Sequence, residues 1–448
     1  MHSQNLTSGN IGRQLVSLAI PLLLGNVLQQ LYNTADSLII GKYLGSDAFA
    51  AVGIAGTVMN LFVFVLSGFC VGVSILFGQF FGSGALDRFR HEMSVSLLWG
   101  SAFTLTLSAV FLGATHFILR AIQTPAALEG YVTAYLNVIT CGLICTYLYN
   151  LCSGILRSVG DTGAALCFLL LAVCMNVALD LLFIAKLHTS AAGAAFATVF
   201  SQGFSAACCF VYLHRRYPEL VCRKEDIGVH RELLGKTFSF GFASALQQSS
   251  LYIGKILVQG AVNTLDTPGI AAFTAATRLE GFLSALGESG SASISVFASQ
   301  NYGAGQFKRL AQGFRRGLCT LLLLGLGLSC IMIVFAEPGI RIFLSGDDPL
   351  ELSYGISYLR LIALFYTLCY AGYAFVGYYR GTGHMSVPVI GTTAHIAIRA
   401  LLSNLLVGRM GLAAVAMAAG TGWVLMIFFH VSMYFYLKKK DAQLAVGQ

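Results

Sequence analysis

Two acidic residues lie in apolar stretches of this sequence, where an ionised side chain is energetically costly. Asp36 lies near the end of the run 15–40, and Asp180 lies near the end of the run 163–185. Acids inside such segments generally have partners and serve a function, because an unpaired charge there is strongly unfavourable. The two chemistries open to a carboxyl group in this setting are cation binding and proton transfer.

Polar side chains share a helix face with each acid. Asn176 precedes Asp180 by four residues, about one helical turn. Four polar residues fall at i, i+3, i+4 and i+7 of the first run and so share one face: Gln29, Tyr32, Asn33 and Asp36. Two carboxylates with amide and hydroxyl oxygens supply the oxygen ligands that a hard cation such as Na+ prefers. Two neighbouring acids also raise each other's affinity for a proton, and the residue types leave both possibilities open.

The amino-acid composition indicates that these residues lie in transmembrane helices. The chain has 448 residues, of which 56% are hydrophobic and 10% are charged, against roughly 25% charged in soluble proteins. Its apolar runs are about 20 to 25 residues long, which matches the thickness of a bilayer. We therefore predict an all-α integral membrane protein with twelve transmembrane helices, at 14–40, 50–78, 93–119, 131–156, 163–185, 191–213, 236–262, 269–298, 312–336, 352–379, 385–407 and 411–437.

The distribution of basic residues predicts the orientation. Most of the 27 Lys and Arg residues fall in the loops of one side, and such an excess marks the cytoplasmic side. Both termini are predicted to be cytoplasmic, in a multi-pass monomer of the cell membrane that contacts lipid. The formal net charge of +8 follows from the same bias and requires no nucleic-acid partner. The 12 cysteines show no CxxC spacing, so we predict from them neither a disulfide framework nor a metal site. We also expect no cofactor.

The sequence contains an internal repeat. "GQFFGSGALDRFR" (78–90) aligns with "SQNYGAGQFKRLA" (299–311), and "LRSVGD" (156–161) aligns with "YRGTGH" (379–384). We call these the first and second motif pairs. The offset along the chain is nearly the same in both pairs, although the pairs lie far apart. A nearly constant offset across the chain indicates a duplication.

The repeat predicts the domain organisation. Each copy has six predicted spans, an even number, so both copies begin on the same side of the membrane. We expect an N-terminal six-helix lobe (1–213), a charged cytoplasmic linker (214–236) and a C-terminal six-helix lobe (237–448). Duplicated lobes suit alternating access, in which one lobe moves against the other around a central cavity.

Four motifs in this order resemble the multidrug and toxic compound extrusion (MATE) family of cation-coupled antiporters: "IPLLLGNVLQQLYNTADSLIIGKYLG", "GILRSVGDT", "NVALDLLFI" and "GAAFATVFSQ". With their second-half echoes they cover nearly all of the chain. The resemblance implies export of small-molecule drugs and toxic compounds, often lipophilic cations, in exchange for Na+ or H+. The residues that match the family's cation-binding group, a possible Na+ site, are Asp36, Asn176, Asp180 and Thr198, with Tyr32 nearby. Pro21 matches a proline at which the family's first helix bends.

The second half lacks the two acids. At the repeat offsets, Gly254 and Ser403 occupy the corresponding positions, and Arg399 stands where the first half has Asn176. Some members of the family carry an acid in the seventh helix, but this sequence has Lys255 there and no acid. We therefore expect the cation site in the N-terminal lobe, and the departure puts a second site in doubt.

A tyrosine stripe in the tenth predicted helix suggests a surface for the substrate. Tyr366, Tyr370 and Tyr373 fall at i, i+4 and i+7, and aromatic faces bind lipophilic cations by stacking and cation–π contact. The same stripe also fits simple packing between helices. The residues predicted to line the substrate cavity are Gln29, Asn33, Tyr135, Tyr366, Tyr370, Tyr373, Lys255, Arg278 and Arg399.

Other function classes fit less well. The sequence has no HExxH, GxSxG or P-loop motif, so we predict that the protein is not an enzyme. A flippase for a lipid-linked or anionic intermediate is the alternative, because the bases Lys255, Arg278, Arg360 and Arg399 could bind a diphosphate. Alternatively, Lys255 and Arg278 could simply pair with Glu280.

Overall fold

The computed structural model describes residues 5–187, 189–228, 230–344 and 348–446. Within these ranges, the side chains of residues 33–35, 37, 38, 46, 47, 121 and 440–446 are not described. All regular secondary structure in the described ranges is helical, as the composition predicts.

The helices follow the two repeats. Those of the first repeat are α1 (Ile11–Gly82), α2 (Leu86–Val95), the π-helix η1 (Ser96–Gly100), α3 (Ser101–Ala121), α4 (Ala126–Cys141), α5 (Leu143–Ser158), α6 (Thr162–Asp180), the π-helix η2 (Leu181–Lys186) and α7 (Ala191–Arg216). Those that follow are the 3₁₀-helix η3 (Lys224–Asp226), α8 (Arg231–Val262), α9 (Thr267–Gly303), α10 (Phe307–Val334), α11 (Ala336–Arg341), α12 (Pro349–Gly381), α13 (Ser386–Met410) and α14 (Leu412–Val446).

The number of membrane crossings agrees with the prediction of twelve. In the described part of the chain, 9 helices are long and apolar enough to span a bilayer, and α4 with α5 makes up to 10. The helices α8 and α9 contain 32 and 37 residues, more than the ~20 that a crossing requires. They supply the remaining two crossings of the twelve-helix fold.

Glycine explains where two of the crossings depart from straight helices. Within α1, Gly45 adopts φ 83° and ψ −177°, which separates the first two predicted spans. This backbone conformation costs little only for glycine. The predicted fourth span, 131–156, is instead two helices bent by 46° about Gly142. A Cβ atom at Gly142 would lie 2.1 Å from Val199 Cγ2, so the bend coincides with a close approach of α7.

The repeat motifs share their backbone geometry as well as their sequence. Gly84 and Gly305, which align in the first motif pair, have φ values of 70° and 69°. Gly160 and Gly383, which align in the second motif pair, both have φ of 82°. Each glycine lies just beyond the end of a helix, where a left-handed residue closes the last turn. The quoted motifs therefore mark helix C-termini, and glycine is required at these positions for a conformational reason.

The chain divides into two compact units. The first contains residues 1–8, 20–245 and 299–305, and the second contains 9–19, 246–298 and 306–448. The start of α8 thus packs with the first repeat, whereas the start of α1 packs with the second. We call these two segments the exchanged segments, residues 231–245 and 9–19.

Close contacts hold the exchanged segments in place. A Cβ atom at Gly72 of α1 would lie 2.1 Å from the carbonyl oxygen of Phe240 in α8, so the two backbones touch. In the second unit, the Ser293 hydroxyl donates to the Leu15 carbonyl at 2.7 Å. These contacts place each exchanged segment inside the unit formed mostly by the other repeat.

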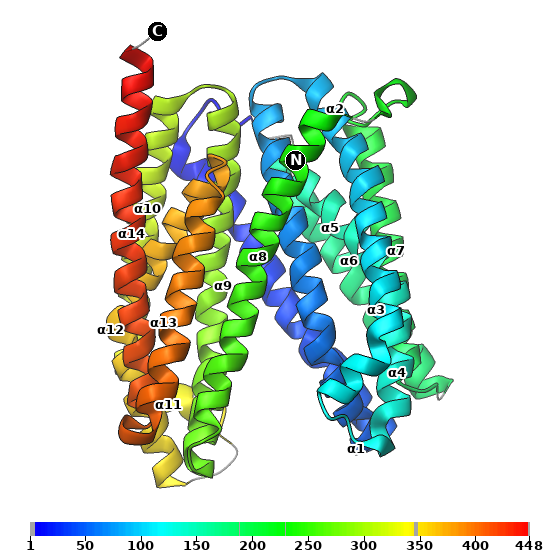
Figure 1. Cartoon of the computed structure of the whole chain (residues 1–448), viewed down its shortest axis with the longest axis vertical. Helices are drawn as coiled ribbons and strands as arrows, with labels where there is room; N and C mark the ends of the chain where they lie inside the picture. The colour runs from blue at the N-terminus through cyan, green and yellow to red at the C-terminus, as the bar shows by residue number, and fades with distance from the viewer. Residues whose placement is uncertain (1–4, 188, 229, 345–347, 447–448) are drawn as a thin grey trace. The chain divides into compact units, whose positions relative to one another are not determined.

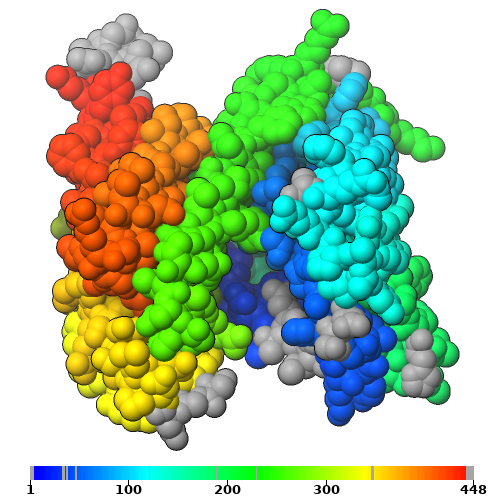
Figure 2. Space-filling view, turned by 60° about the horizontal axis from the view of Figure 1, so that its bottom comes forward, coloured from blue at the N-terminus to red at the C-terminus, as the bar shows by residue number. Residues whose placement is uncertain are grey.

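Long helices packed side by side form the second unit. In Figure 1, α10, α12, α13 and α14 run as neighbouring rods, and α12 contacts both α10 and α14. Figure 2 shows α14, in red, lying along α13, in orange.

Aromatic side chains fill much of the core of the first unit. Phe69 of α1 is 1% exposed and packs against Phe238 and Phe242 of α8, with ring centroids 5.7 and 5.9 Å apart. Edge-on pairs of this kind add to the stabilisation from burial. The core therefore includes the start of α8.

The connector between α7 and α8 is anchored on α2. Asp226 is 6% exposed and accepts hydrogen bonds from Arg90 Nε at 3.1 Å and from the Arg223 backbone N–H at 2.8 Å. His91 Nε2 lies 3.5 Å from the other carboxylate oxygen, and the His91 ring stacks on His230 with centroids 4.0 Å apart. Burial by itself raises the pKa of Asp226, but the Arg223 N–H and the charges of Arg90 and His91 outweigh burial and hold the pKa below its usual range.

Candidate functional site

The two acids singled out by the sequence meet inside the first unit. The carboxyl groups of Asp36 in α1 and Asp180 in α6 are near enough to interact with each other electrostatically. Asp180 is fully buried, and the Oδ1 atoms of both acids are buried without a hydrogen-bond partner. Two adjacent buried carboxylates repel each other, so such a pair favours binding a proton or a cation over carrying two negative charges.

Three neutral side chains lie in the same cluster. When the Asn176 amide is oriented to satisfy its neighbours, its nitrogen donates to Asp180 Oδ2 at 2.9 Å, and its oxygen accepts from the Thr198 backbone N–H at 3.2 Å. The hydroxyls of Tyr32 and Thr198 are 3.2 Å apart. Carboxyl, amide and hydroxyl oxygens from α1, α6 and α7 therefore lie together.

Two features beside the acids were not predicted as parts of this cluster. Tyr135 of α4, predicted as a cavity residue, is 3% exposed and interacts electrostatically with Asp36, Tyr32 and Asp180. The helix changes to π geometry directly after Asp180, and π turns occur frequently at functional sites. The repeat offers one signal for the tyrosine, since Tyr358 corresponds to Tyr135 at the offset of the second motif pair.

A family model described as MatE matches residues 21–182 and 243–402. The chain belongs to the MATE family. The two matched ranges fall in the two repeats, so the family comparison detects the duplication as well.

Relatives and solved structures agree with this membership. The probable multidrug resistance protein YpnP of Bacillus subtilis is 27% identical over 389 residues, 86% of each chain. The FAD transporter of Shewanella oneidensis is 28% identical over 353 residues, 77% of each chain. A solved outward-facing structure of a multidrug resistance MATE transporter of the MOP superfamily has a TM-score of 0.89 and 22% identity, over 98% of both chains. The last comparison shows the MATE fold.

The other predicted residues of the first helix lie outside this contact network. Gln29 is exposed, and the side chain of Asn33 lies outside the described residues. Pro21 is half-buried, and α1 continues as a helix through it. Its predicted role as a hinge stays a prediction.

The tyrosine stripe of this MATE protein is mostly packed within the second unit. Tyr366 and Tyr370 are 2% and 0% exposed, and the Tyr370 hydroxyl donates to the Leu283 carbonyl at 2.5 Å. Tyr366 packs edge-on against Trp423 with centroids 6.0 Å apart. Tyr373 alone of the three is half-buried. The faces of the first two rings are covered by protein, which favours the packing interpretation for them.

Of the pairings considered from the sequence, the described residues show an electrostatic interaction between Lys255 and Glu280. Lys255 and Arg278 are exposed, and neither belongs to an ion pair of the described residues. Glu280 interacts most strongly with Arg399, and the Tyr358 hydroxyl interacts with both. The second unit therefore has an internal acid–base cluster where the first unit has two acids.

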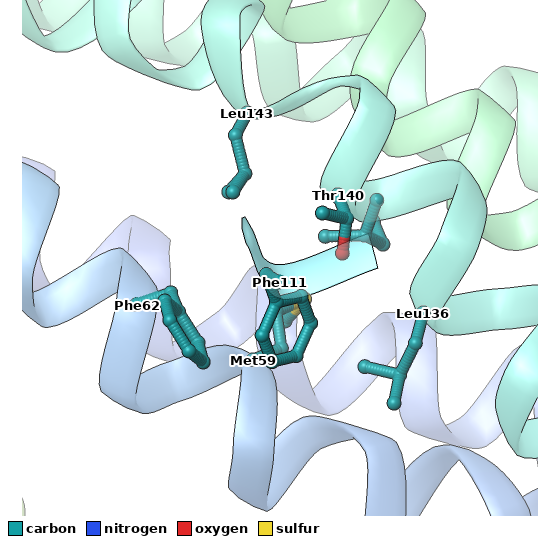
Figure 3. Close-up of a pocket in the computed structure, with 7 residues that line it drawn as sticks. Met59, Phe62, Phe111, Leu136, Thr140 and Leu143 are labelled. Carbon is teal, nitrogen blue, oxygen red and sulfur yellow. The ribbon is translucent and has the colours of Figure 1, made fainter. Parts of the chain in front are cut away.

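A small pocket in the first unit is too small for a drug. Figure 3 shows its lining, which is apolar except for the Thr140 hydroxyl. Its free volume is about 10 Å³, against roughly 300–1,000 Å³ for a site that encloses a drug-sized molecule. The rings of Phe62 and Phe111 meet there with centroids 4.2 Å apart. This pocket is a packing crevice between α1, α3, α4 and α5.

Proposed function

We propose that this MATE protein is an antiporter that exports lipophilic, often cationic, drugs and toxic compounds by alternating access, driven by Na+ or H+. The contact between Asp36 and Asp180 carries the proposal. Two adjacent buried acids whose Oδ1 atoms have no hydrogen-bond partner can bind and release a proton or a cation, which gives the pair two states of different charge. Family membership and the multidrug names of relatives support export as the direction of transport.

The cation-binding group would work through the charge of the acid pair. We assign Asp36, Asp180, Asn176, Thr198 and Tyr32 to this group. Bound Na+ would be held by carboxyl, amide and hydroxyl oxygens, whereas H+ would be held as the shared proton. In either case, occupation lowers the negative charge at membrane depth, where charge is strongly disfavoured. Occupied and unoccupied forms therefore favour different arrangements of α1 and α6.

We base the proposed substrate class on family membership rather than on contacts of individual side chains. A flippase for a lipid-linked anion is not favoured, because the first unit keeps the acid pair. An anionic flavin nucleotide should be assayed beside a cationic dye. One relative is named an FAD transporter, and the exposed bases Lys255 and Arg278 could contact an anion. Uptake of the dye is the expected outcome.

The topology is part of the proposal. We infer a cell-membrane monomer with both termini cytoplasmic, two six-helix lobes (1–213 and 237–448) and a cytoplasmic linker (214–236). The excess of Lys and Arg in the loops of one side supports this orientation. Protease accessibility of a C-terminal tag in inside-out and right-side-out vesicles tests the orientation.

Asp36→Asn tests the coupling. The amide keeps the volume and hydrogen bonding of the acid but cannot change charge. Reconstituted vesicles with an imposed Na+ or proton gradient and a lipophilic cationic dye should show gradient-driven uptake with the natural protein and none with the variant. Asp87→Asn, at a position whose side chain is 82% exposed, is the matched control and should transport normally. Gradient-driven uptake by the Asp36→Asn protein at the natural rate would remove this acid from the mechanism.

A further inference from the structure

Glu92 is a fully buried acid outside the candidate cation site. It lies in α2 with 0% of its side chain exposed. The neighbouring Phe89 and Met93 belong to the apolar core of the first unit, and Phe238 of α8 packs against that core. The ion pairs of the described residues do not include Glu92. An acid buried without a counter-charge needs another way to avoid an uncompensated charge.

The hydroxyl groups around Glu92 indicate its protonation state. Thr237 Oγ1 lies 2.8 and 3.0 Å from the two carboxyl oxygens of Glu92 and 2.7 Å from the Leu233 carbonyl oxygen. Ser96 Oγ lies 3.1 Å from Glu92 Oε1. One threonine hydroxyl has a single hydrogen and cannot donate to Leu233 and Glu92 at once.

A neutral acid supplies the hydrogen that is otherwise missing between Glu92 and Thr237. Glu92 Oε2 then carries the proton and donates to Thr237, Thr237 donates to the Leu233 carbonyl in its own helix, and Ser96 donates to Oε1. An ionised carboxylate would instead compete with Leu233 for the threonine hydrogen. Geometry and burial therefore favour the protonated form.

The backbone next to Glu92 departs from regular α-helix and packs closely against α5. The π-helix η1 begins at Ser96, and the Tyr147 hydroxyl donates to the Ser96 carbonyl at 2.6 Å. A Cβ atom at Gly100 would lie 1.8 Å from Tyr147 Oη, so a glycine is needed where α5 approaches. Ser96 thus stands at the start of the π turn, where its hydroxyl contacts Glu92 one turn earlier and its carbonyl accepts from the tyrosine.

Other titratable and charged groups near this site have partners elsewhere. The Tyr147 phenol of α5 is the one other titratable group for which the described residues show an interaction with Glu92. The charged neighbours on α2 and α8 are directed to other partners: Arg90 and His91 to Asp226, and Lys236 and Arg88 to Glu232.

Thr237 connects the Glu92 site to the start of α8. Thr237 belongs to the exchanged segment 231–245, the part of α8 that packs in the first unit before the helix continues into the second. We propose that Glu92 is a proton-binding site whose neutral acid holds the start of α8 against α2 and whose ionisation, with the proton passing to water, releases it. The proposal does not depend on Asp36, on the coupling ion or on the substrate.

Hydrogen exchange of the intact protein, followed by mass spectrometry across a pH series, tests the proposal. After correction for the intrinsic rate, exchange of the α8 amides in 233–245 should rise by up to about tenfold for each pH unit above the pKa of an exposed glutamate, about 4.3, and should level off once Glu92 is ionised in the closed state as well. Glu92→Gln, which stays neutral, should show a flat profile. Glu232→Gln is the matched control, since it removes an exposed acid of the same helix, and it should behave as the natural protein.

Two further comparisons keep the test decisive if Glu92→Gln does not fold. Thr237→Val should raise exchange in 233–245 already at low pH, whereas Thr237→Ser should keep the natural profile because it retains the hydroxyl. Infrared spectra should show a carboxylic acid C=O band that Glu92→Gln lacks and Glu232→Gln keeps. A flat profile in the natural protein, a natural profile in Glu92→Gln, or an unchanged acid band in Glu92→Gln would each overturn the proposal.

Discussion

Replacing Asp226 by asparagine should release the connector from α2. The carboxylate accepts hydrogen bonds from Arg90 Nε and the Arg223 N–H, and a bond to a charged group contributes about 1.5–3 kcal/mol. Arg90 keeps Asp87 as a second partner, and solvent screens contacts near the surface. We therefore expect a loss of about 2 kcal/mol in total, which raises the open fraction of the connector about 30-fold.

Trypsin digestion at neutral pH measures this change, because the connector contains Arg223 and Lys224. Initial cleavage of Asp226→Asn should be about 30 times faster than that of the natural protein when opening and closing are fast relative to cleavage. Glu225→Gln is the matched control, because it neutralises an adjacent but exposed acid, and it should be cleaved at the natural rate. Equal cleavage of the two variants would refute the role assigned to Asp226.

The same contact predicts a pH dependence. Because the pKa of Asp226 is held below its usual range, its contribution is present above the pKa of about 3.9 of an unfolded aspartate. The contribution is lost as the pH falls through the lower folded value. Hydrogen exchange of the connector amides, corrected for intrinsic rate, should therefore differ between the natural protein and Asp226→Asn at neutral pH and converge under strongly acidic conditions. A difference that persists unchanged at low pH would contradict the electrostatic explanation.

Four further outcomes are expected. Asp180→Asn should abolish the response of dye uptake to an ion gradient, and near-normal uptake in vesicles would exclude this acid from coupling. Glu280→Gln should change the range of transported dyes more than the ion dependence, and the reverse pattern in the same assay would place a coupling site in the second unit. Pro21→Ala should reduce the factor by which bound cation weakens drug affinity, measured by calorimetry with each ligand titrated alone and with the other; an unchanged factor would count against the hinge. Gly72→Ala should destabilise the protein by about 1–3 kcal/mol through overpacking against α8 and lower its melting temperature, whereas Gly56→Ala, whose Cβ would meet no atom within 4 Å, should not.

The sequence predicted those parts of the fold that depend on local pattern. Twelve apolar runs gave the crossings, and the spacing of Asn176 and Asp180 placed both on one face of α6. The repeat motifs were recognisable because their glycines are fixed by a backbone conformation, as the φ values of Gly160 and Gly383 show. Such features depend on a few neighbouring residues, so one sequence suffices to find them.

Features that depend on distant contacts were not predictable. Glu92 and Thr237 lie far apart in the chain, and neither position carries a motif. The π turns after Val95 and Asp180 depend on neighbouring helices, and no local residue pattern marks them. The bend at Gly142 was missed for the same reason, since it coincides with the approach of Val199 from α7, far along the chain. The packing of Tyr366 and Tyr370 likewise became visible only with their neighbours in place.

The exchanged segments suggest how the duplicated chain began. Each unit is completed by the first part of a helix encoded in the opposite repeat, 231–245 in one direction and 9–19 in the other. Two separate copies of a half-length ancestor would show the same reciprocity as a domain-swapped homodimer, a low-cost route to association. Gene fusion would then have turned an intermolecular exchange into an intramolecular one, with the stretch between α7 and α8 as the joint. Either half of this protein, expressed alone, would lack helix segments that the other half supplies to its core, and it would expose the matching surface.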